Sequence, residues 1–227
     1  MNGVLKLFNM NQLVFKFPFK TKYYEQDFYV SSNNFSAYKL VESWPDWPGK
    51  WLNIFGDKGS GKTHLSKILE KKINNVKIID ANKLSDEVLG ELINLDCLII
   101  DNFNKNVNEK LLYSILNHSK QLENYIFINS LKSIKENQFD LKDLQSRVNS
   151  FTYIGIELPT DDLLKVIISK YFSEKQIDVS PKISEFIIKN VERSYEKMFK
   201  FIKDLDDLSL SSGKSININL IKKILNQ

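Results

Sequence analysis

Eight consecutive residues have the types and the spacing needed to bind the phosphates of a nucleotide, matching the pattern G-x-x-x-x-G-K-[ST]. Glycines let backbone N–H groups turn toward phosphate oxygens, where side chains would collide. The lysine supplies positive charge for the outer phosphates, and the threonine offers a hydroxyl to Mg²⁺. The loop consists of Gly56, Asp57, Lys58, Gly59, Ser60, Gly61, Lys62 and Thr63.

The flanking residues place this loop between a strand and a helix. Residues 51–55 are apolar and typical of a strand, and residues 62–73 carry apolar side chains at helical spacing. The chain has only 8 glycines, so a chance match in this context is rare. We therefore predict a site for ADP or ATP with Mg²⁺, in which the helix N-terminus faces the phosphates.

Asp101 is the best partner for the loop, because it ends the apolar run 97–101. An acid at the end of a parallel strand is where nucleotide hydrolases coordinate Mg²⁺, so Thr63 and Asp101 are the expected metal ligands. Asn102 follows and cannot accept a proton as an acid would. General-base assistance is worth about 10²–10⁴-fold, so we expect weak intrinsic hydrolysis.

Three further residues could act on phosphate. Asn129 and Ser130 end another apolar run, and they suit equally a γ-phosphate contact or an ordinary strand end. Arg147 is one of only two arginines among 32 basic residues. Its planar fork suits phosphate recognition, but its position alone leaves a surface ion pair equally open.

Strand-like and helical segments alternate along residues 51–158, which predicts a parallel five-stranded sheet flanked by helices. The expected strands are 51–55, 76–80, 97–101, 125–128 and 152–158, and the helices between them are 62–73, 85–93, 108–122 and 140–148. After Pro159 the pattern is helical only, with helices expected at 161–175, 181–191, 195–208 and 220–225. We expect an extended segment at 1–22, a nucleotide-binding α/β domain at 23–158 and a small helical domain at 159–227.

Composition excludes several classes of protein. The net charge of +4 permits nucleic-acid contact without indicating it. No apolar run approaches the roughly 20 residues of a membrane helix, and no signal peptide is evident. The single cysteine, Cys97, lies in an apolar run and suits a core position. We expect a cytoplasmic protein without membrane association.

The chain resembles the DnaA branch of the AAA+ ATPases in its short, Hda-type form. The resemblance rests on residues 27–33, 44–48 and 143–147 and on the continuation of the phosphate loop into His64 and Leu65. It implies that Phe28, Val30 and His64 line the nucleotide and that Asn129 and Ser130 fall on the sensor 1 position. It also implies that Arg147 is an arginine finger acting in trans on another subunit's nucleotide.

The chain departs from this family at the lid and at its C-terminal end. Glu196 or Lys197 falls where the sensor 2 arginine is expected, which puts nucleotide closure through the lid in doubt. The initiator's DNA-reading helix-turn-helix domain has no counterpart after Gln227, so we expect no sequence-specific DNA binding.

The resemblance also implies partners. Gln12, Leu13, Phe15 and Phe17 belong to a hexapeptide similar to the one by which such regulators bind the β sliding clamp. Alternating apolar side chains suit insertion into a groove, although an edge strand remains the alternative. The implied function is regulation of replication initiation, in which Arg147 promotes hydrolysis of ATP held by the DnaA initiator. A helicase-loader-like ATPase, a non-enzymatic nucleotide-stabilised adaptor and a homo-oligomer remain open.

Overall fold

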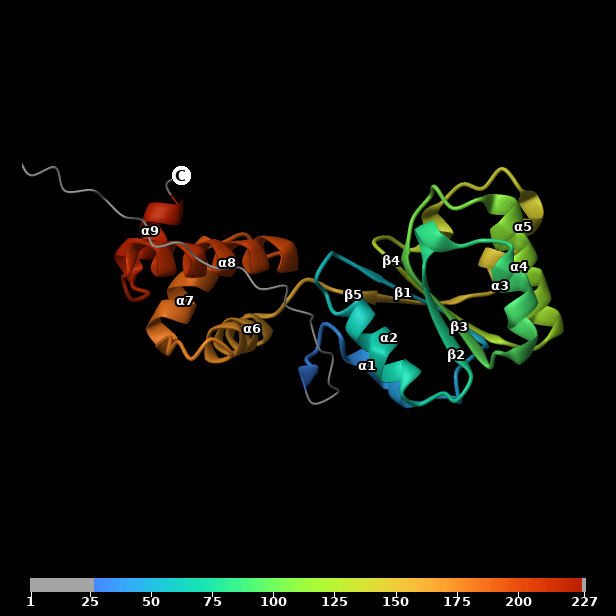
Figure 1. Cartoon of the computed structure of the whole chain (residues 1–227), viewed down its shortest axis with the longest axis horizontal. Helices are drawn as coiled ribbons and strands as arrows, with labels where there is room; N and C mark the ends of the chain where they lie inside the picture. The colour runs from blue at the N-terminus through green and yellow to red at the C-terminus, as the bar shows by residue number, and fades with distance from the viewer. Residues whose placement is uncertain (1–26, 226–227) are drawn as a thin grey trace, which may run out of the picture. The chain divides into compact units, whose positions relative to one another are not determined.

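A computed structural model describes residues 27–225 of the chain (Figure 1). The described residues form two compact units, each with its own core. One unit holds residues 27–163 and 194–196, and the other holds residues 164–193 and 197–225. Within residues 27–225, no helix combines the length and the apolar character needed to cross a membrane.

The first unit contains one five-stranded sheet in which every neighbouring pair is parallel. The strand order is β2-β3-β4-β1-β5, so the strand before the phosphate loop lies between β4 and β5. The parallel five-stranded sheet, its flanking helices and the separate helical unit confirm the predicted α/β fold followed by a small helical domain. The strands are β1 (Trp51–Gly56), β2 (Val76–Asp80), β3 (Cys97–Phe103), β4 (Tyr125–Ser130) and β5 (Thr152–Ile156).

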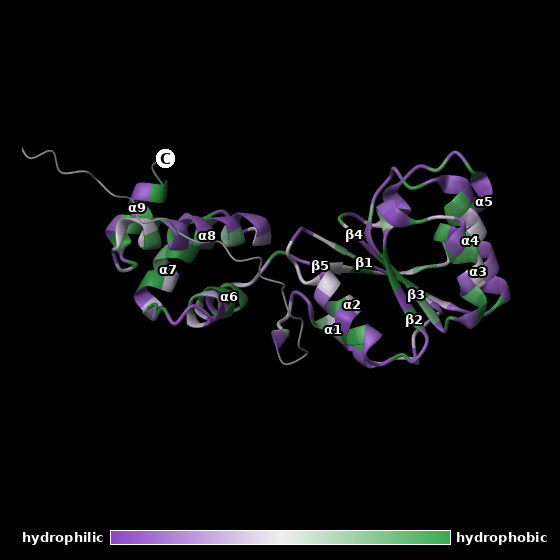
Figure 2. Ribbon diagram, in the orientation of Figure 1, coloured by the Kyte–Doolittle hydropathy of each residue, from purple (hydrophilic) through white to green (hydrophobic). Residues whose placement is uncertain are grey.

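Helices cover both faces of the sheet because successive strand residues point to opposite sides. Cys97 and Ile99 enter the core beneath α1 (Phe35–Glu42) and α2 (Lys62–Glu70). Leu98 and Ile100 enter the core on the other face, where the helices are α3 (Glu87–Glu91), α4 (Glu109–Gln121) and α5 (Lys142–Val148). Figure 2 shows hydrophobic residues concentrated along the strands, as burial on both faces requires.

The element bounds differ from the predicted ones in several places. Helix α1 was not predicted, because its buried stripe consists of only Ala37 and Val41. Strand β3 runs two residues beyond Asp101, and the register with β4 shifts between Ile100 and Phe103. Short 3₁₀ helices lie at η2 (Ala81–Lys83), η3 (Leu92–Asn94) and η4 (Ile134–Glu136).

Four helices make up most of the chain after β5, and they pack around an apolar core that includes Phe172, Met198 and Ile202. Pro181 occupies the first turn of its helix, where a missing N–H costs nothing. Asp206 is almost fully buried and pairs with Lys175. The helices are α6 (Asp161–Ser173), α7 (Pro181–Asn190), α8 (Tyr195–Ser212) and α9 (Ile218–Leu225).

Candidate nucleotide-binding site

The phosphate loop joins β1 to α2 and excludes side chains at two of its glycines. Gly61 has φ 97°, and a Cβ there would lie 2.9 Å from the ring of Phe28. A Cβ on Gly56 would lie 2.8 Å from the backbone oxygen of Ile156. Because real Cβ atoms do not approach so closely, glycine is required at both positions, and the loop presents its backbone instead.

Lys62 carries its charge into the centre of the loop. Its Nζ donates hydrogen bonds to the backbone oxygens of Gly56 (2.7 Å) and Asp57 (2.9 Å) and lies 3.4 Å from Ser60 Oγ. Burial lowers the pKa of Lys62, and the nearby carboxylates of Asp101 and Asp57 partly oppose that effect. A partly desolvated cation in this position suits the outer phosphates of a nucleotide.

Asp101 is the centre of a hydrogen-bonded set at the carboxyl end of the sheet. The Thr63 hydroxyl donates to Asp101 Oδ2 at 2.9 Å. Asn129 Nδ2 donates to Asp101 Oδ1 at 3.0 Å, as does the backbone N–H of Asn102. Hydroxyl and carboxylate oxygens are the ligands that Mg²⁺ prefers, so Thr63 and Asp101 fit the metal expected with a nucleotide.

The structure separates the two candidates at the end of β4. Asn129 faces Asp101 and also donates to Ser66 Oγ on α2 at 2.6 Å. Ser130 Oγ instead accepts a hydrogen bond from Asn53 Nδ2 at 2.9 Å. Asn53 was not among the predicted residues, although a single asparagine inside an apolar strand is the signal that marks it. Asn129 is therefore the residue of this pair that contacts Asp101.

Asn102 turns toward β2. It has φ 56°, a left-handed conformation that asparagine tolerates better than most residues. Its Nδ2 donates to Asp80 Oδ2 at 2.8 Å. This hydrogen bond is the main reason that the pKa of Asp80 is lowered, with a second contribution from the backbone N–H of Asn82. The amide after Asp101 is thus engaged with a carboxylate at the end of the neighbouring strand.

Aromatic side chains lie beside the loop where the sequence predicts the adenine. The Phe28 ring stacks on Tyr38 with centroids 5.7 Å apart, and it meets His64 edge-on at 5.3 Å. Val30 lies half-buried in the same segment. Flat apolar rings next to a phosphate loop suit a purine base.

The start of α8 belongs to the same compact unit as the sheet. Asn33 donates to the hydroxyl of Tyr195, and burial raises the pKa of that hydroxyl to about 12. Glu196, at one of the two positions where a lid arginine was sought, forms an ion pair with Lys58 of the phosphate loop (2.9 Å). Both side chains are more than half exposed, so this pair contributes about 0–1 kcal/mol.

Arg147 lies near the end of α5, at the opposite edge of the sheet from the phosphate loop. Its Nη2 donates to Asn117 Oδ1 on α4 at 2.8 Å. Its Nε is buried and has no hydrogen-bond partner among residues 27–225. The predicted clamp-binding residues Gln12, Leu13, Phe15 and Phe17 lie outside the described residues.

Known proteins resemble the chain both in sequence and in fold. Residues 164–225 match a family model described as the Hda lid domain. An uncharacterized protein of Haemophilus influenzae is 24% identical over 213 residues, covering 88% of this chain and 92% of that protein. The chromosomal replication initiator protein DnaA of Spiroplasma citri is 28% identical over 198 residues, covering 73% of this chain and 43% of that protein. The chain spans about half the length of the curated DnaA relatives that it matches.

Solved structures show the same fold. Domain III of DnaA from Thermotoga maritima superposes with a TM-score of 0.74 at 19% identity, over 92% of this chain and 98% of that one. DnaA from Aquifex aeolicus, solved with AMPPCP bound, superposes with a TM-score of 0.68 at 21% identity. That match covers 86% of this chain and 68% of that one.

Proposed function

Because the chain is a DnaA/Hda-like AAA+ protein, we propose that it regulates replication initiation by promoting hydrolysis of ATP bound to DnaA. In this proposal the chain binds ADP or ATP with its own phosphate loop. Arg147 acts as an arginine finger on the nucleotide of the partner. The Hda-type lid match and the DnaA relatives support regulation of initiation as the setting.

Nucleotide binding by the chain itself rests on the set around Asp101. Lys62 would bind the outer phosphates, while Thr63 and Asp101 would hold Mg²⁺, which neutralises charge on the phosphates. Phe28 and His64 would hold the base. A DnaA structure of the same fold was solved with AMPPCP, an analogue of ATP, which supports an adenine nucleotide as the ligand.

The position of Arg147 is the observation that carries the proposal. Ile156, at the carboxyl end of β5, pairs with Gly56 at the start of the phosphate loop. Arg147 precedes Thr152, at the amino end of the same strand. A five-residue strand rises about 13 Å between its first and last residue, so Arg147 lies at the far edge from its own loop. An arginine there suits a nucleotide held by another protein.

We expect the chain to hydrolyse its own bound ATP only weakly, because no acid follows Asp101. Asn102 cannot take a proton from water, and its amide is already bonded to Asp80. A protein whose catalytic contribution is to a partner's ATP does not need rapid turnover of its own nucleotide. Attachment to the β sliding clamp through residues 12–17 completes the proposal and rests on the sequence resemblance.

The direct test measures how fast DnaA hydrolyses its bound ATP, as phosphate release. The rate is compared in the presence and in the absence of this chain bound to the sliding clamp. The Arg147→Ala variant should lose about 10³-fold or more of any finger-dependent acceleration while still binding DnaA. Arg147→Lys keeps the charge but not the planar fork, and should recover little. Arg193→Ala removes the other arginine and serves as the matched control. Equal stimulation by Arg147→Ala and the unmodified chain would exclude the finger.

A second candidate function is a loader-like ATPase that hydrolyses its own ATP. Thr63, Asp101 and Asn129 favour it, because both Thr63 and Asn129 donate hydrogen bonds to the Asp101 carboxylate beside the phosphate loop. This alternative predicts substantial phosphate release by the purified chain alone. It also predicts that Lys62→Ala abolishes that release without any partner present.

A further inference from the structure

A bulge in β3 decides where the residue after Asp101 points. Between the paired positions Ile100 and Phe103, β3 has two residues, Asp101 and Asn102, where β4 has one. Such a bulge bends the strand and re-aims a side chain. Asn102 also has φ 56°, so its side chain does not follow the simple alternation of a strand.

The Asn102 side chain is turned away from the phosphate loop. Its Nδ2 donates to Asp80 Oδ2 at 2.8 Å, at the carboxyl end of β2. In the sheet, β2 lies on one side of β3, whereas β1, which leads into the phosphate loop, lies beyond β4 on the other side. Asp101, by contrast, accepts a hydrogen bond from Thr63 of the loop. Adjacent residues of β3 therefore engage different neighbours, one the phosphate loop and the other β2.

Four polar side chains close a ring of hydrogen bonds around the contact between Asn102 and Asp80. The backbone N–H and Nδ2 of Asn82 donate to Asp80 Oδ1 at 2.9 and 3.0 Å. Asn104 Nδ2 donates to Asn82 Oδ1 and to the backbone oxygen of Asn102, each at 3.2 Å. Both oxygens of Asp80 are thus occupied, and an ionised carboxylate only accepts, so it fixes the NH₂ end of the Asn102 amide toward β2.

We propose that Asp80 is a positioning residue that holds Asn102 away from the phosphate loop and thereby protects the chain's own nucleotide from hydrolysis. The inference rests on the proposed nucleotide site and adds a second reason for slow turnover. Asn102 cannot act as a base, and the contact with Asp80 also keeps this position of β3 from a water beside the phosphates. The bound nucleotide then stays intact, as suits a protein whose catalytic contribution is to a partner's ATP.

Two double variants place an acid at position 102 and differ only in whether position 80 can hold it. Asp80→Ala with Asn102→Asp leaves the new acid free. Asp80→Asn with Asn102→Asp holds it, because the new amide can donate to it while still accepting from the backbone N–H of Asn82. In hydrolysis a water oxygen bonds to the γ-phosphorus, the bond to the ADP oxygen breaks with its electron pair leaving on ADP, and the acid takes the proton of the water.

Phosphate release by the purified chain measures the difference between these variants. The free acid should accelerate release about 10²-fold or more, the usual contribution of a positioned general base. The held acid should be about tenfold to a hundredfold slower than the free one, since a hydrogen bond to a charged group shifts an equilibrium by that much. Equal acceleration by both variants would mean that position 80 does not hold position 102 back.

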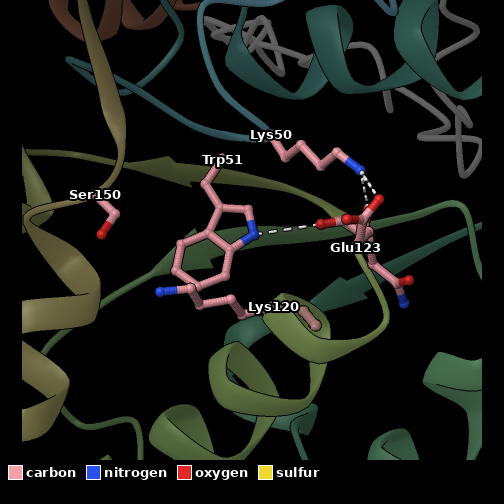
Figure 3. A pocket seen from close by; sticks show the side chains of 7 residues that line it. Lys50, Trp51, Lys120, Glu123 and Ser150 are labelled. Atoms are coloured by element: carbon pink, nitrogen blue, oxygen red, sulfur yellow. Dashed lines mark hydrogen bonds and ion pairs between the residues drawn. The ribbon is translucent and has the colours of Figure 1, made fainter.

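An NMR signal tests the same contact without turnover. Asp80→Ala should shift the side-chain amide resonance of Asn102 in a ¹H–¹⁵N spectrum and speed the exchange of its protons with water. Glu123→Gln is the control, because it neutralises another hydrogen-bonded carboxylate far from the phosphate loop. Figure 3 shows Glu123, which precedes β4 at the amino edge of the sheet, paired with Lys50 at 3.0 Å. This control should leave the Asn102 resonance and the hydrolysis rate unchanged.

The outcomes separate this inference from the proposal on which it rests. If the unmodified chain binds nucleotide but neither double variant accelerates hydrolysis, position 102 does not reach the water even when it is free, and the inference alone is overturned. If the unmodified chain binds neither ADP nor ATP in a titration, the proposed nucleotide site is overturned and the inference with it. If Asp80→Ala leaves the Asn102 amide resonance in place, the hydrogen bond that carries the inference is absent in solution.

Discussion

Replacing Asn129 with alanine tests whether this side chain holds Asp101 in place. The substitution removes a hydrogen bond to Ser66 Oγ and one to the Asp101 carboxylate. Such bonds contribute about 1 kcal/mol between neutral groups and about 2 kcal/mol to a charged group. The alanine also removes Asn129 Oδ1, which is buried without a partner among residues 27–225, and this returns about 1 kcal/mol.

The expected net loss is therefore about 2 kcal/mol in the free energy of unfolding, or a fall in Tm of about 4–8 °C. Urea unfolding and differential scanning calorimetry measure these quantities, and phosphate release measures the effect on hydrolysis. We expect hydrolysis to fall as well, because Asp101 loses a donor that orients it toward Thr63.

Asn129→Asp is the matched variant, since it keeps the shape but adds a carboxylate about 3 Å from Asp101. Repulsion raises the pKa of one member of the pair in the folded state. The destabilisation is therefore full at pH 7 and shrinks as the pH falls toward about 4, because the folded state then takes up a proton. The free energy of unfolding of Asn129→Ala could lie within about 0.5 kcal/mol of that of the unmodified chain, and the two could hydrolyse ATP equally fast. In that case the hydrogen bonds assigned to Asn129 do not hold Asp101 in place.

Two further predictions follow from pKa values. Burial raises the pKa of Cys97 well above its ordinary value. The native chain at pH 8 should therefore not react with a thiol reagent, whereas the chain unfolded in guanidinium should react fully. Mass spectrometry distinguishes the modified chain from the unmodified one. Asn102→Ala removes the hydrogen bond that most lowers the pKa of Asp80, so this pKa should rise toward its ordinary value in a ¹³C NMR titration. The stability that ionised Asp80 contributes is present above about pH 4 and lost as the pH falls through its lowered folded value, and it should shrink in this variant. An unchanged Asp80 titration would mean that Asn102 does not bond to it in solution.

The parts of the site that lie on neighbouring residues could be predicted from the sequence. The phosphate loop is contiguous, and Asp101 is recognisable because the four apolar residues 97–100 directly precede it. What could not be predicted depends on which way a side chain faces. Asn129 and Ser130 are adjacent, but alternation along β4 sends one toward Asp101 and the other toward Asn53.

Local irregularities explain most of the remaining differences. Asn102 bonds to Asp80 because β3 changes register after Ile100 and because Asn102 has a positive φ, neither of which a periodic pattern reveals. The link between Arg147 and Asn117 joins residues 30 positions apart, and it depends on how α4 packs against α5. The burial of the Ser119 hydroxyl, which has no hydrogen-bond partner among residues 27–225, likewise depends on the elements that pack against α4.

The separation of Arg147 from the phosphate loop also limits how the chain's own nucleotide can control it. A ligand shifts a conformational equilibrium only by as much as it binds the two states differently. A nucleotide bound at the phosphate loop can therefore affect Arg147 only if a structural change is transmitted across the sheet to its opposite edge. That transmission requires a contact that can adopt two different arrangements. We expect the hydrogen bond between Arg147 Nη2 and Asn117 Oδ1 to be the contact that changes, because Arg147 Nε is buried without a hydrogen-bond partner among residues 27–225. A nucleotide that loosened the packing of α4 against α5 would free the arginine, and one that tightened it would hold the arginine back.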